Sequence, residues 1–503
     1  MSEGIPASRA ADSSLRWPSV LVSVRALIER EALVIAVIGM WTALLFVLMP
    51  ALVVSDTWLS LVDGRLIAQH WLPHHDTLTL WTLGRSWIDQ QWGAHLILYE
   101  LAAHGGLRAA LGVGVACVVA ALVVVAVAAR KLGASQRSTA LALMLPIVAA
   151  PWLVQVRSQS FGLVLFVAVY ALLAYDTRRP GKRVLWVLPL LVLWANLHGS
   201  VALGAGLSLL YGLFAARRRS DRWRGLLLAG GAPLCVLASP YGFRLIAYYR
   251  LMLVHPPLAS FVNEWQPAKI ATYTAIFFGS AFVLSALWGA HRNVLTPFER
   301  WALPLLLIGA LTAVRNTVWF ELAVGIALPR LLDAVWPARM TLTPSIRRAN
   351  LLISSATLVA VVVIGAVELT RPQAWFDHGA SPTLAAAVSR AAGTDGAVLA
   401  DDEHSDWLLW FEPALTGRVA FDVRFELFST AELDQIALLR AGSHPVWRRC
   451  GSLARVVTFD GPGDERAALR EGVLAKGSTT IVRSPSFVAV SQPVVASGER
   501  CTI

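Results

Sequence analysis

The chain has 503 residues, of which 56% are hydrophobic and only 15% are charged. A soluble globular protein of this length does not carry so much apolar surface, so we expect a protein that crosses a membrane many times. The net charge of +11 lies largely in short Lys- and Arg-containing segments between apolar runs, which argues for membrane topology and contact with anionic lipids and against a nucleic-acid partner.

Residues 1–32 are polar and contain several Arg, so we predict a cytoplasmic N-terminal segment and no cleavable signal peptide. Apolar runs of membrane length then predict a mostly α-helical, polytopic bundle. We place about eleven spans, at 33–54, 108–129, 138–155, 159–175, 184–197, 200–216, 224–240, 272–290, 299–314, 316–335 and 350–368. With the N-terminus inside, the basic loops fall in the cytoplasm, and an odd number of spans places the C-terminal segment outside.

Two stretches between spans are too polar to cross the membrane and too long to be turns. The first, 55–107, carries five Trp residues, and we expect an outer loop with short helices that lie on the membrane surface. The second, 241–271, contains three Tyr and a Pro-Pro pair and is predicted to lie on the same surface.

The composition changes after residue 370, so we divide the chain into a membrane module at 33–370 and an extracytoplasmic domain at 371–503. Helical stretches at 381–392, 430–441 and 465–474 alternate with β-like runs at 397–400, 418–421, 454–457 and 480–482. This alternation predicts an α/β domain with a largely parallel sheet. Cys450 and Cys501 both fall in this domain, where a disulfide is possible, whereas Cys117 and Cys235 lie in apolar spans.

Most polar residues beside the spans map to one face of the membrane. Ionisable groups are costly next to hydrocarbon, so their collection on one face suggests a site. The predicted outer groups are Asp56, Asp63, Arg65, His74, His75, Asp76, Arg85, Asp89, His95, Gln155, Arg157, Gln159, Asn196, His198, Arg244, Glu264, Arg315 and Asn316.

Asp56, directly after the first span, is a candidate general base. It could equally cap a helix that begins at Thr57, and the two roles are compatible. Asp76 follows Pro73-His74-His75, a pattern that favours a turn or an N-cap over a metal site. We also include Asp76 among the candidate substrate contacts.

Two predicted outer hairpins contain an arginine, which runs against the charge bias of outer loops and requires a partner. Arg157 and Arg315 could bind a phosphate, because a guanidinium binds phosphate oxygens in a bidentate manner. The alternative is a structural pair with Glu264 or Glu321.

Further polar residues lie at 159, 194–199, 264 and 401–406. In Trp194-Ala195-Asn196-Leu197-His198-Gly199, the Asn and His could hydrogen-bond an acceptor sugar or only stabilise a turn. Gln159 and Glu264 are further candidate substrate contacts. The acidic run 401–406 has the pattern of a strand-to-helix loop with solvated carboxylates more than of a cation site.

Taken together, these motifs resemble the C-class (GT-C) membrane glycosyltransferases, and more closely bacterial membrane proteins of that type. The resemblance covers most of the chain and rests on Asp56-Thr57-Trp58, Gly64, Pro73 to Asp76, Trp87 to Trp92, Arg157-Ser158-Gln159, 194–199, Pro240-Tyr241-Gly242, Glu264-Trp265 and 422–426. It implies a polyprenyl-phosphate-linked sugar as donor, Asp56 as base, Arg157 and Arg315 as phosphate ligands, and Asn196 and His198 as substrate contacts.

The resemblance therefore predicts a glycosyltransferase at the outer face of a bacterial plasma membrane, with a glycan or lipid as acceptor and no soluble cofactor. Asp56 lacks a nearby second acid in an Asp-x-Asp pattern, so the sequence names no metal ligand and leaves metal dependence open. A transporter or flippase of a lipid-linked or anionic substrate is an alternative, as is a non-catalytic envelope assembly protein.

Overall fold

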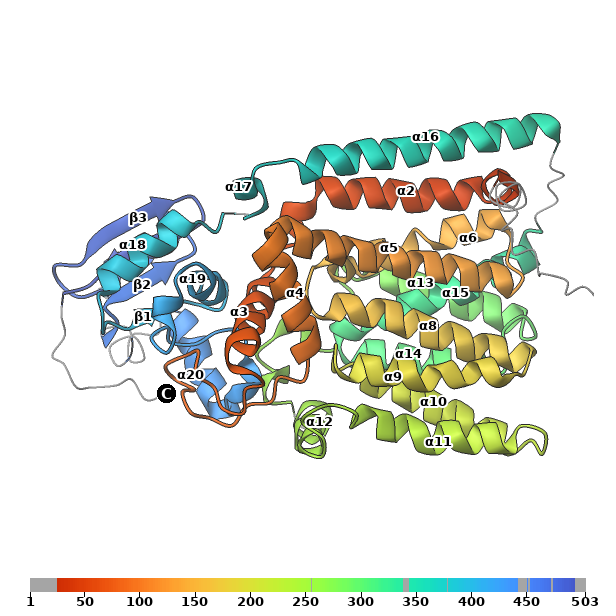
Figure 1. Ribbon diagram of the computed structural model, residues 1–503, viewed down its shortest axis with the longest axis horizontal. Helices are drawn as coiled ribbons and strands as arrows, with labels where there is room; N and C mark the ends of the chain where they lie inside the picture. The colour runs from red at the N-terminus through yellow and green to blue at the C-terminus, as the bar shows by residue number, and fades with distance from the viewer. Residues whose placement is uncertain are drawn as a thin grey trace, which may run out of the picture.

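The computed structural model describes residues 25–254, 256–337, 343–377, 379–441, 450, 453–471 and 474–493. Most helices of the membrane module run side by side, and the C-terminal domain lies beyond one end of this bundle (Figure 1). Ten of them coincide with predicted spans: α2 (Ala32–Val47), α5 (Leu107–Lys131), α8 (Gln159–Arg178), α9 (Val187–Ala195), α10 (Val201–Ala216), α11 (Arg222–Val236), α13 (Ala275–Ala290), α14 (Glu299–Thr312), α15 (Thr317–Val335) and α16 (Pro344–Leu369).

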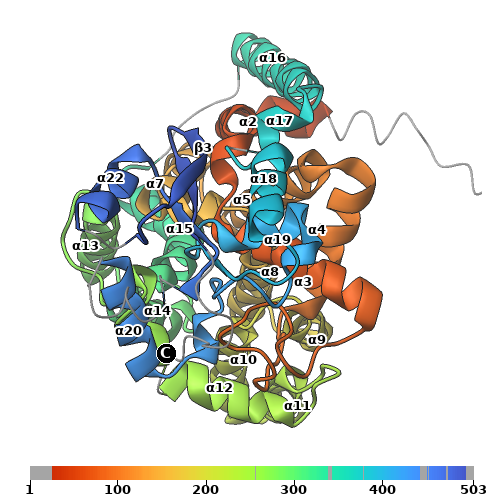
Figure 2. The same ribbon diagram turned by 90° about the vertical axis from the view of Figure 1, so that its left-hand side faces the viewer.

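Three of these helices, α5, α8 and α16, are long and apolar enough to cross a membrane, and α2, α10 and α13 are shorter apolar helices. The number of spans therefore stays a prediction. α15 is buried throughout from Thr317 to Leu331, because it packs against α5, α6, α7, α8, α13 and α14. α16 instead packs against α2 on one side and exposes Leu352, Val359 and Val362 on the other, a surface suited to lipid (Figure 2).

The prediction of one continuous span at 138–155 is wrong. The structure divides this segment into α6 (Gln136–Ala142), α7 (Leu145–Ala149) and the 3₁₀ turn η2 (Pro151–Val154). Pro146 and Pro151 stand in the first positions of α7 and η2. A proline donates no backbone hydrogen bond and its ring clashes with the preceding turn, so each one ends the helix before it.

The predicted outer loop contains two helices, α3 (Ser55–His70) and α4 (Trp92–Gly105), which lie between the bundle and the C-terminal domain (Figure 1). They pack closely at Gly64, where a Cβ atom would lie 2.2 Å from the carbonyl oxygen of His95. The second polar stretch contains α12 (Arg244–Val254) and the short 3₁₀ turns η4 (Pro257–Ala259) and η5 (Asn263–Trp265). Lys182–Trp186 forms the turn η3 before α9, and η1 (Met49–Leu52) and η6 (Val314–Asn316) precede α3 and α15.

The described residues of the C-terminal domain form four strands in the order β1-β2-β4-β3: β1 (Val398–Leu399), β2 (Val456–Phe459), β3 (Thr479–Ser484) and β4 (Phe487–Ser491). Among the described strands, β1 and β2 pair in parallel, whereas β2–β4 and β3–β4 are antiparallel, so the sheet is mixed. The prediction of a largely parallel sheet therefore holds only on the β1 side, where the isolated bridges of Val419 with Val398 and Thr79 are parallel as well. Pro485 and Ser486 alone connect β3 to β4, and so short a connection permits only an antiparallel pair. The helices and turns of the domain are α17 (Gln373–Phe376), α18 (Pro382–Ala392), α19 (Ser405–Phe411), η7 (Pro413–Leu415), η8 (Phe425–Leu427), α20 (Thr430–Arg440) and α22 (Pro462–Arg470).

Backbone hydrogen bonds connect the first outer loop to the C-terminal domain. The N–H of Leu80 donates to Val419 O at 2.7 Å, and the N–H of Trp81 donates to Ala420 O at 3.0 Å. Within the predicted β-run 418–421, Val419 forms isolated bridges with Thr79 and with Val398 of β1. The loop thereby extends the sheet beside β1, and loop and domain form one unit over the end of the bundle.

The predicted disulfide is tested only in part. Cys450 is buried and disulfide-bonded, whereas Cys501 lies outside the described residues, so the pairing of these two cysteines stays a prediction. Cys117 and Cys235 are free cysteines in α5 and α11.

Candidate functional site

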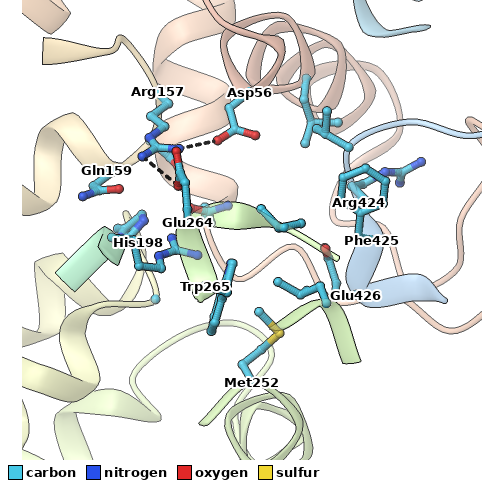
Figure 3. Close-up of a pocket in the computed structure, with 18 of the residues that line it drawn as sticks. Asp56, Arg157, Gln159, His198, Met252, Glu264, Trp265, Arg424, Phe425 and Glu426 are labelled. Carbon is cyan, nitrogen blue, oxygen red and sulfur yellow. Dashed lines mark hydrogen bonds and ion pairs between the residues drawn. The ribbon is translucent and has the colours of Figure 1, made fainter. Parts of the chain in front are cut away.

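A polar cavity of about 590 Å³ lies where the bundle, the first outer loop and the C-terminal domain meet (Figure 3). The cavity is bordered by the start of α3, the turn before α8, the turn before α10, parts of α12 and of 258–265, and η6 with the start of α15. Residues 423–426 line it from the domain side. Six predicted site residues from distant parts of the chain line this cavity: Asp56, Arg157, Gln159, His198, Glu264 and Arg315. The structure thus brings together most of the candidate site residues, which the sequence placed only on a common face.

Arg157 links two carboxylates in the cavity. Its Nη1 lies 2.9 Å from Asp56 Oδ2, and both Nη atoms lie 3.4 Å from Glu264 Oε2. The Arg157 side chain is 9% exposed, whereas those of Asp56 and Glu264 are 43% and 32% exposed, so the carboxylates face the cavity and the guanidinium lies behind them. Burial lowers the pKa of Arg157, but Glu264 and Asp56 outweigh burial and raise it, so the guanidinium stays charged.

Asp56 does not cap a helix that begins at Thr57, because α3 already begins at Ser55 and its N-cap is Val54. The side chain of Thr57 stabilises the turn instead: its Oγ1 accepts from the Val54 N–H at 3.0 Å and donates to Val156 O at 2.5 Å. Asp56 therefore lies in the first turn of α3, where the unpaired N–H groups of the helix favour a negative charge.

Arg315 is the second guanidinium of the cavity. It stacks on the Trp265 ring at 4.3 Å and makes no hydrogen bond or ion pair within the part of the chain that the structure describes. Burial, followed by the neighbouring charge of Arg157, lowers the pKa of Arg315, although an arginine remains protonated at neutral pH. A half-buried cation whose N–H groups have no acceptor is well suited to bind an oxyanion.

His198 is neutral and presents a donor. Burial, Arg315 and Arg157 hold the pKa of His198 well below its usual value of 6.5. Its Nδ1 accepts from the backbone N–H of Ser200 at 3.1 Å, so the remaining proton of the neutral ring is on Nε2. Gln159, whose Oε1 is buried without a partner among the described residues, adds an unused acceptor to the same wall.

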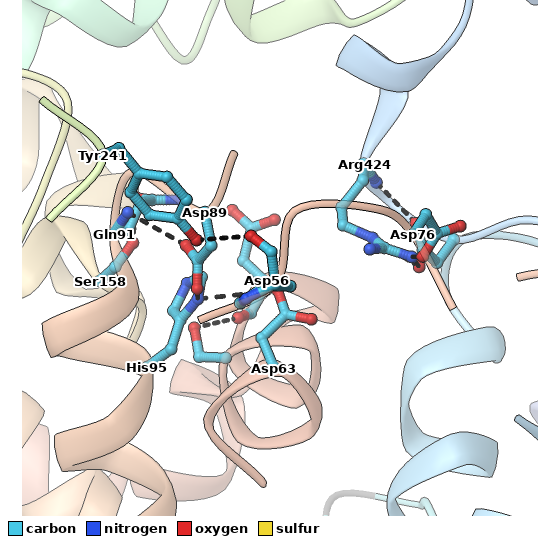
Figure 4. Close-up of polar contacts among 12 residues, drawn as sticks. Asp56, Asp63, Asp76, Asp89, Gln91, His95, Ser158, Tyr241 and Arg424 are labelled. Carbon is cyan, nitrogen blue, oxygen red and sulfur yellow. Dashed lines mark hydrogen bonds and ion pairs between the residues drawn. The ribbon is translucent and has the colours of Figure 1, made fainter. Parts of the chain in front are cut away.

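The structure does not place Asp76 or Asn196 among the cavity residues. Asp76 is fully buried, accepts hydrogen bonds from Leu78 N–H and the hydroxyls of Thr79 and Thr82, and pairs with Arg424 at 2.8 Å (Figure 4). It organises a turn, and with its oxygens so engaged the predicted substrate contact has no support. Asn196 accepts from Trp92 Nε1–H at 3.0 Å and donates from Nδ2 to the carbonyls of Val192 and Ala238, so its amide N–H groups are engaged within the protein and its predicted substrate contact stays a prediction.

Glu426 lines the cavity from the domain side and had no role assigned from the sequence. Burial raises its pKa to about 7, so the group changes charge close to neutral pH. The motif 422–426 pointed to this segment, but only the fold shows that a residue some 370 positions after Asp56 shares its cavity. Tyr248, Gln91 and His95 line the cavity as well.

Among the residues that the structure describes, two groups of side chains have the composition of a divalent-metal site. Asp63, Asp89 and His95 present ligand atoms within 4.8 Å of one another beside the cavity (Figure 4), and so do Asp401, His404 and Asp460 in the C-terminal domain. In the first group His95 Nδ1 already lies 2.9 Å from Asp89 Oδ2 and 3.6 Å from Asp63 Oδ2. Burial lowers the pKa of His95 but Asp89 outweighs this effect and raises it, so a protonated His95 can take the place of a cation there.

No protein-family model and no curated protein matches the chain. Solved structures do. The oligosaccharyltransferase of Archaeoglobus fulgidus, in its apo form, is similar with a TM-score of 0.50 and 11% identity over 84% of this chain and 69% of that one. ArnT of Cupriavidus metallidurans, bound to undecaprenyl phosphate, is similar with a TM-score of 0.50 and 12% identity over 97% of this chain and 100% of that one. Both structures have the GT-C fold, and the chain described here shares this fold. Its helices α5, α8 and α16 are long and apolar enough to cross a membrane.

Proposed function

We propose that the protein transfers a sugar from a polyprenyl-phosphate-linked donor to a glycan or lipid acceptor at the outer face of a bacterial plasma membrane. The observation that supports this most strongly is one cavity in which a carboxylate, Asp56, lies with two guanidinium groups, Arg157 and Arg315, on a GT-C fold. The carboxylate can deprotonate a hydroxyl while the two guanidinium groups stabilise the leaving phosphate.

In the proposed reaction, an acceptor hydroxyl hydrogen-bonds the Asp56 carboxylate and loses its proton to it. The hydroxyl oxygen then forms a bond with the anomeric carbon while the bond between that carbon and the phosphate oxygen breaks. The electron pair of the broken bond stays on the polyprenyl phosphate, whose added charge is stabilised by Arg315 and by Arg157. The ion pair of Arg157 with Asp56 also orients the base.

The sugar and acceptor have polar contacts available in the same wall. His198 can donate from Nε2, and Gln159 can accept at an oxygen that has no protein partner within the described ranges. Because an unpaired buried acceptor is costly, a donor group of the substrate at Gln159 would stabilise the complex. The proposal involves no soluble cofactor. If a divalent cation binds, Asp63, Asp89 and His95 would be its ligands, and the cation would stabilise the first outer loop.

Replacement of Arg315 by Gln is expected to weaken binding of polyprenyl phosphate about 10- to 100-fold, because hydrogen bonds to a charged group contribute about 1.5–3 kcal/mol. The measurement is titration of the purified protein with a short-chain polyprenyl phosphate. Arg244→Gln is the matched control, since Arg244 is exposed beside His74 and outside the cavity. Equal affinities of wild type and Arg315→Gln would exclude Arg315 as a phosphate ligand.

The affinity for an anionic donor is expected to fall as the pH rises through about 7, because Glu426 is neutral below its raised pKa and negative above it. The probe is a non-transferable phosphodiester analogue of the donor, whose own charge is constant over this range. Glu426→Gln should bind equally well at pH 6 and pH 8, with the affinity that wild type shows at the lower pH. If the pH dependence persists in Glu426→Gln, another group controls it.

A further inference from the structure

A second large cavity, of about 730 Å³, lies at the C-terminal ends of α5 and α8. These two helices pack against each other, and their C-terminal ends lie at the end of the bundle opposite to the C-terminal domain (Figure 1). The first turn after α8 and the start of η3 complete the wall. This cavity shares no residue with the candidate active site.

One part of the cavity wall is apolar. It is formed by small and aliphatic side chains of α5 and α8, of Leu132 directly after α5 and of Val184 in η3: Val124, Val127, Ala128, Leu132, Ala168, Ala171, Leu172 and Val184. Since an α-helix rises 1.5 Å per residue, the wall extends roughly 10 Å along α5 from Lys131 to Val124 and roughly 16 Å along α8 from Arg179 to Ala168. An apolar groove of this length between two membrane-length helices fits a hydrocarbon chain.

The mouth of the cavity is cationic. Lys131, Arg179, Lys182 and Arg183 line it, and all four are exposed. Within the residues that the structure describes, none of these four side chains makes a hydrogen bond or an ion pair. The acidic lining residue, Asp176, is occupied: it accepts from Gly181 N–H at 2.7 Å, from Tyr211 and from Arg224, whose charge balances its own. The mouth therefore carries four uncompensated positive charges.

We propose that this cavity is a binding site for one anionic glycerophospholipid of the membrane leaflet that faces away from the C-terminal domain. The phosphate would lie among Lys131, Arg179, Lys182 and Arg183, and one acyl chain would lie along α5 and α8. A free phosphate would leave the apolar wall uncovered. A zwitterionic lipid would bring an ammonium group to a mouth with no free carboxylate, so an anionic headgroup is favoured.

Basic residues at helix ends also complement the helix dipole and follow the positive-inside rule, neither of which requires a specific lipid. The turn between α10 and α11 offers a matched comparison at the same end of the bundle (Figure 1). It carries four exposed arginines, Arg217, Arg218, Arg219 and Arg222, none of which lines this cavity. If charge alone attracted lipids, both clusters would act alike.

The test is native mass spectrometry of the full-length protein after delipidation and addition of equal amounts of phosphatidylglycerol and phosphatidylcholine. Wild type is expected to retain one phosphatidylglycerol. The lipid-bound fraction should fall about tenfold or more in the quadruple variant Lys131→Gln/Arg179→Gln/Lys182→Gln/Arg183→Gln. The control Arg217→Gln/Arg218→Gln/Arg219→Gln/Arg222→Gln should retain the lipid as wild type does. Equal retention in both variants, equal loss in both, or equal binding of the two lipids would overturn the proposal.

A second variant keeps all charges and fills the groove instead. Ala171→Phe places a ring in the apolar wall and is expected to release the lipid although the four cations remain. Melting temperatures of all variants, measured without added lipid, report whether the helices still pack. Full lipid retention by a folded Ala171→Phe would contradict an acyl-chain site between α5 and α8.

Discussion

Asp56→Asn is expected to lower the turnover rate for sugar transfer about 10²- to 10⁴-fold, the usual contribution of a positioned general base. Asparagine keeps the shape of the side chain and an oxygen that can accept from Arg157, which lies 2.9 Å from the present carboxylate. It cannot take up the acceptor proton. The loss should therefore fall on kcat, measured as initial rates at saturating donor, and the donor KM should change little.

Glu426→Gln serves as the matched carboxylate variant of the same cavity. It should change the pH dependence of donor binding and leave most of the turnover rate in place. A catalytic role for Asp56 would be refuted if Asp56→Asn turned over at the wild-type rate. A large loss in Glu426→Gln with none in Asp56→Asn would move the base to the other side of the cavity.

Arg424→Met is expected to destabilise the attachment of the C-terminal domain by about 3–5 kcal/mol, because removal of one partner leaves buried charges uncompensated. Arg424 is 2% exposed, lies 2.6 Å from Asp422 Oδ2 and 2.8 Å from Asp76 Oδ1, and stacks on Trp87 at 4.5 Å. It thus joins the domain to the first outer loop. Burial raises the pKa of Asp76, but the charge of Arg424 and the hydrogen bonds of Asp76 outweigh burial and lower it.

The measurement is thermal unfolding in detergent combined with limited proteolysis of the C-terminal domain. Arg390→Met is the control, since Arg390 is an exposed residue at the end of α18 in the same domain. Arg424→Met should melt lower and be cut faster, whereas Arg390→Met should behave as wild type. Similar melting and cutting of both variants would show that the buried pairs do not hold the domain in place.

The helical part of the fold could be read from the sequence because an apolar run of membrane length has few alternatives to a helix. α5, α8 and α15 begin or end within a few residues of their predicted limits. The segment 138–155 has the length and apolar character of a single span, but Pro146 and Pro151 divide it into shorter helices. The antiparallel part of the sheet was not predicted for another reason: β2 pairs with β4 through long-range contacts that the local alternation of strands and helices does not reveal.

The sequence could predict at which end of the helical bundle a candidate residue lies, but not which residues are its neighbours there. Arg157 and Arg315 both lie in turns at the start of a helix, α8 and α15, at the same end of the bundle, and both line the cavity. Asp76 lies at a similar depth, yet its oxygens are taken by Arg424, a residue far along the chain that only the folded domain brings near. Glu426 was missed for the same reason, since sequence periodicity carries no information on which face of a distant domain covers the cavity.

The most direct test of the proposed function measures transfer of the radiolabelled sugar from donor to acceptor. Purified protein is reconstituted in liposomes with a panel of radiolabelled polyprenyl-phosphate-linked sugars and lipid or glycan acceptors, with Asp56→Asn in parallel. We predict that wild type transfers the sugar of one donor to an acceptor, with release of polyprenyl phosphate, and that Asp56→Asn does not. Movement of an intact donor across the bilayer at equal rates in both proteins would contradict the proposed transferase and would identify a flippase.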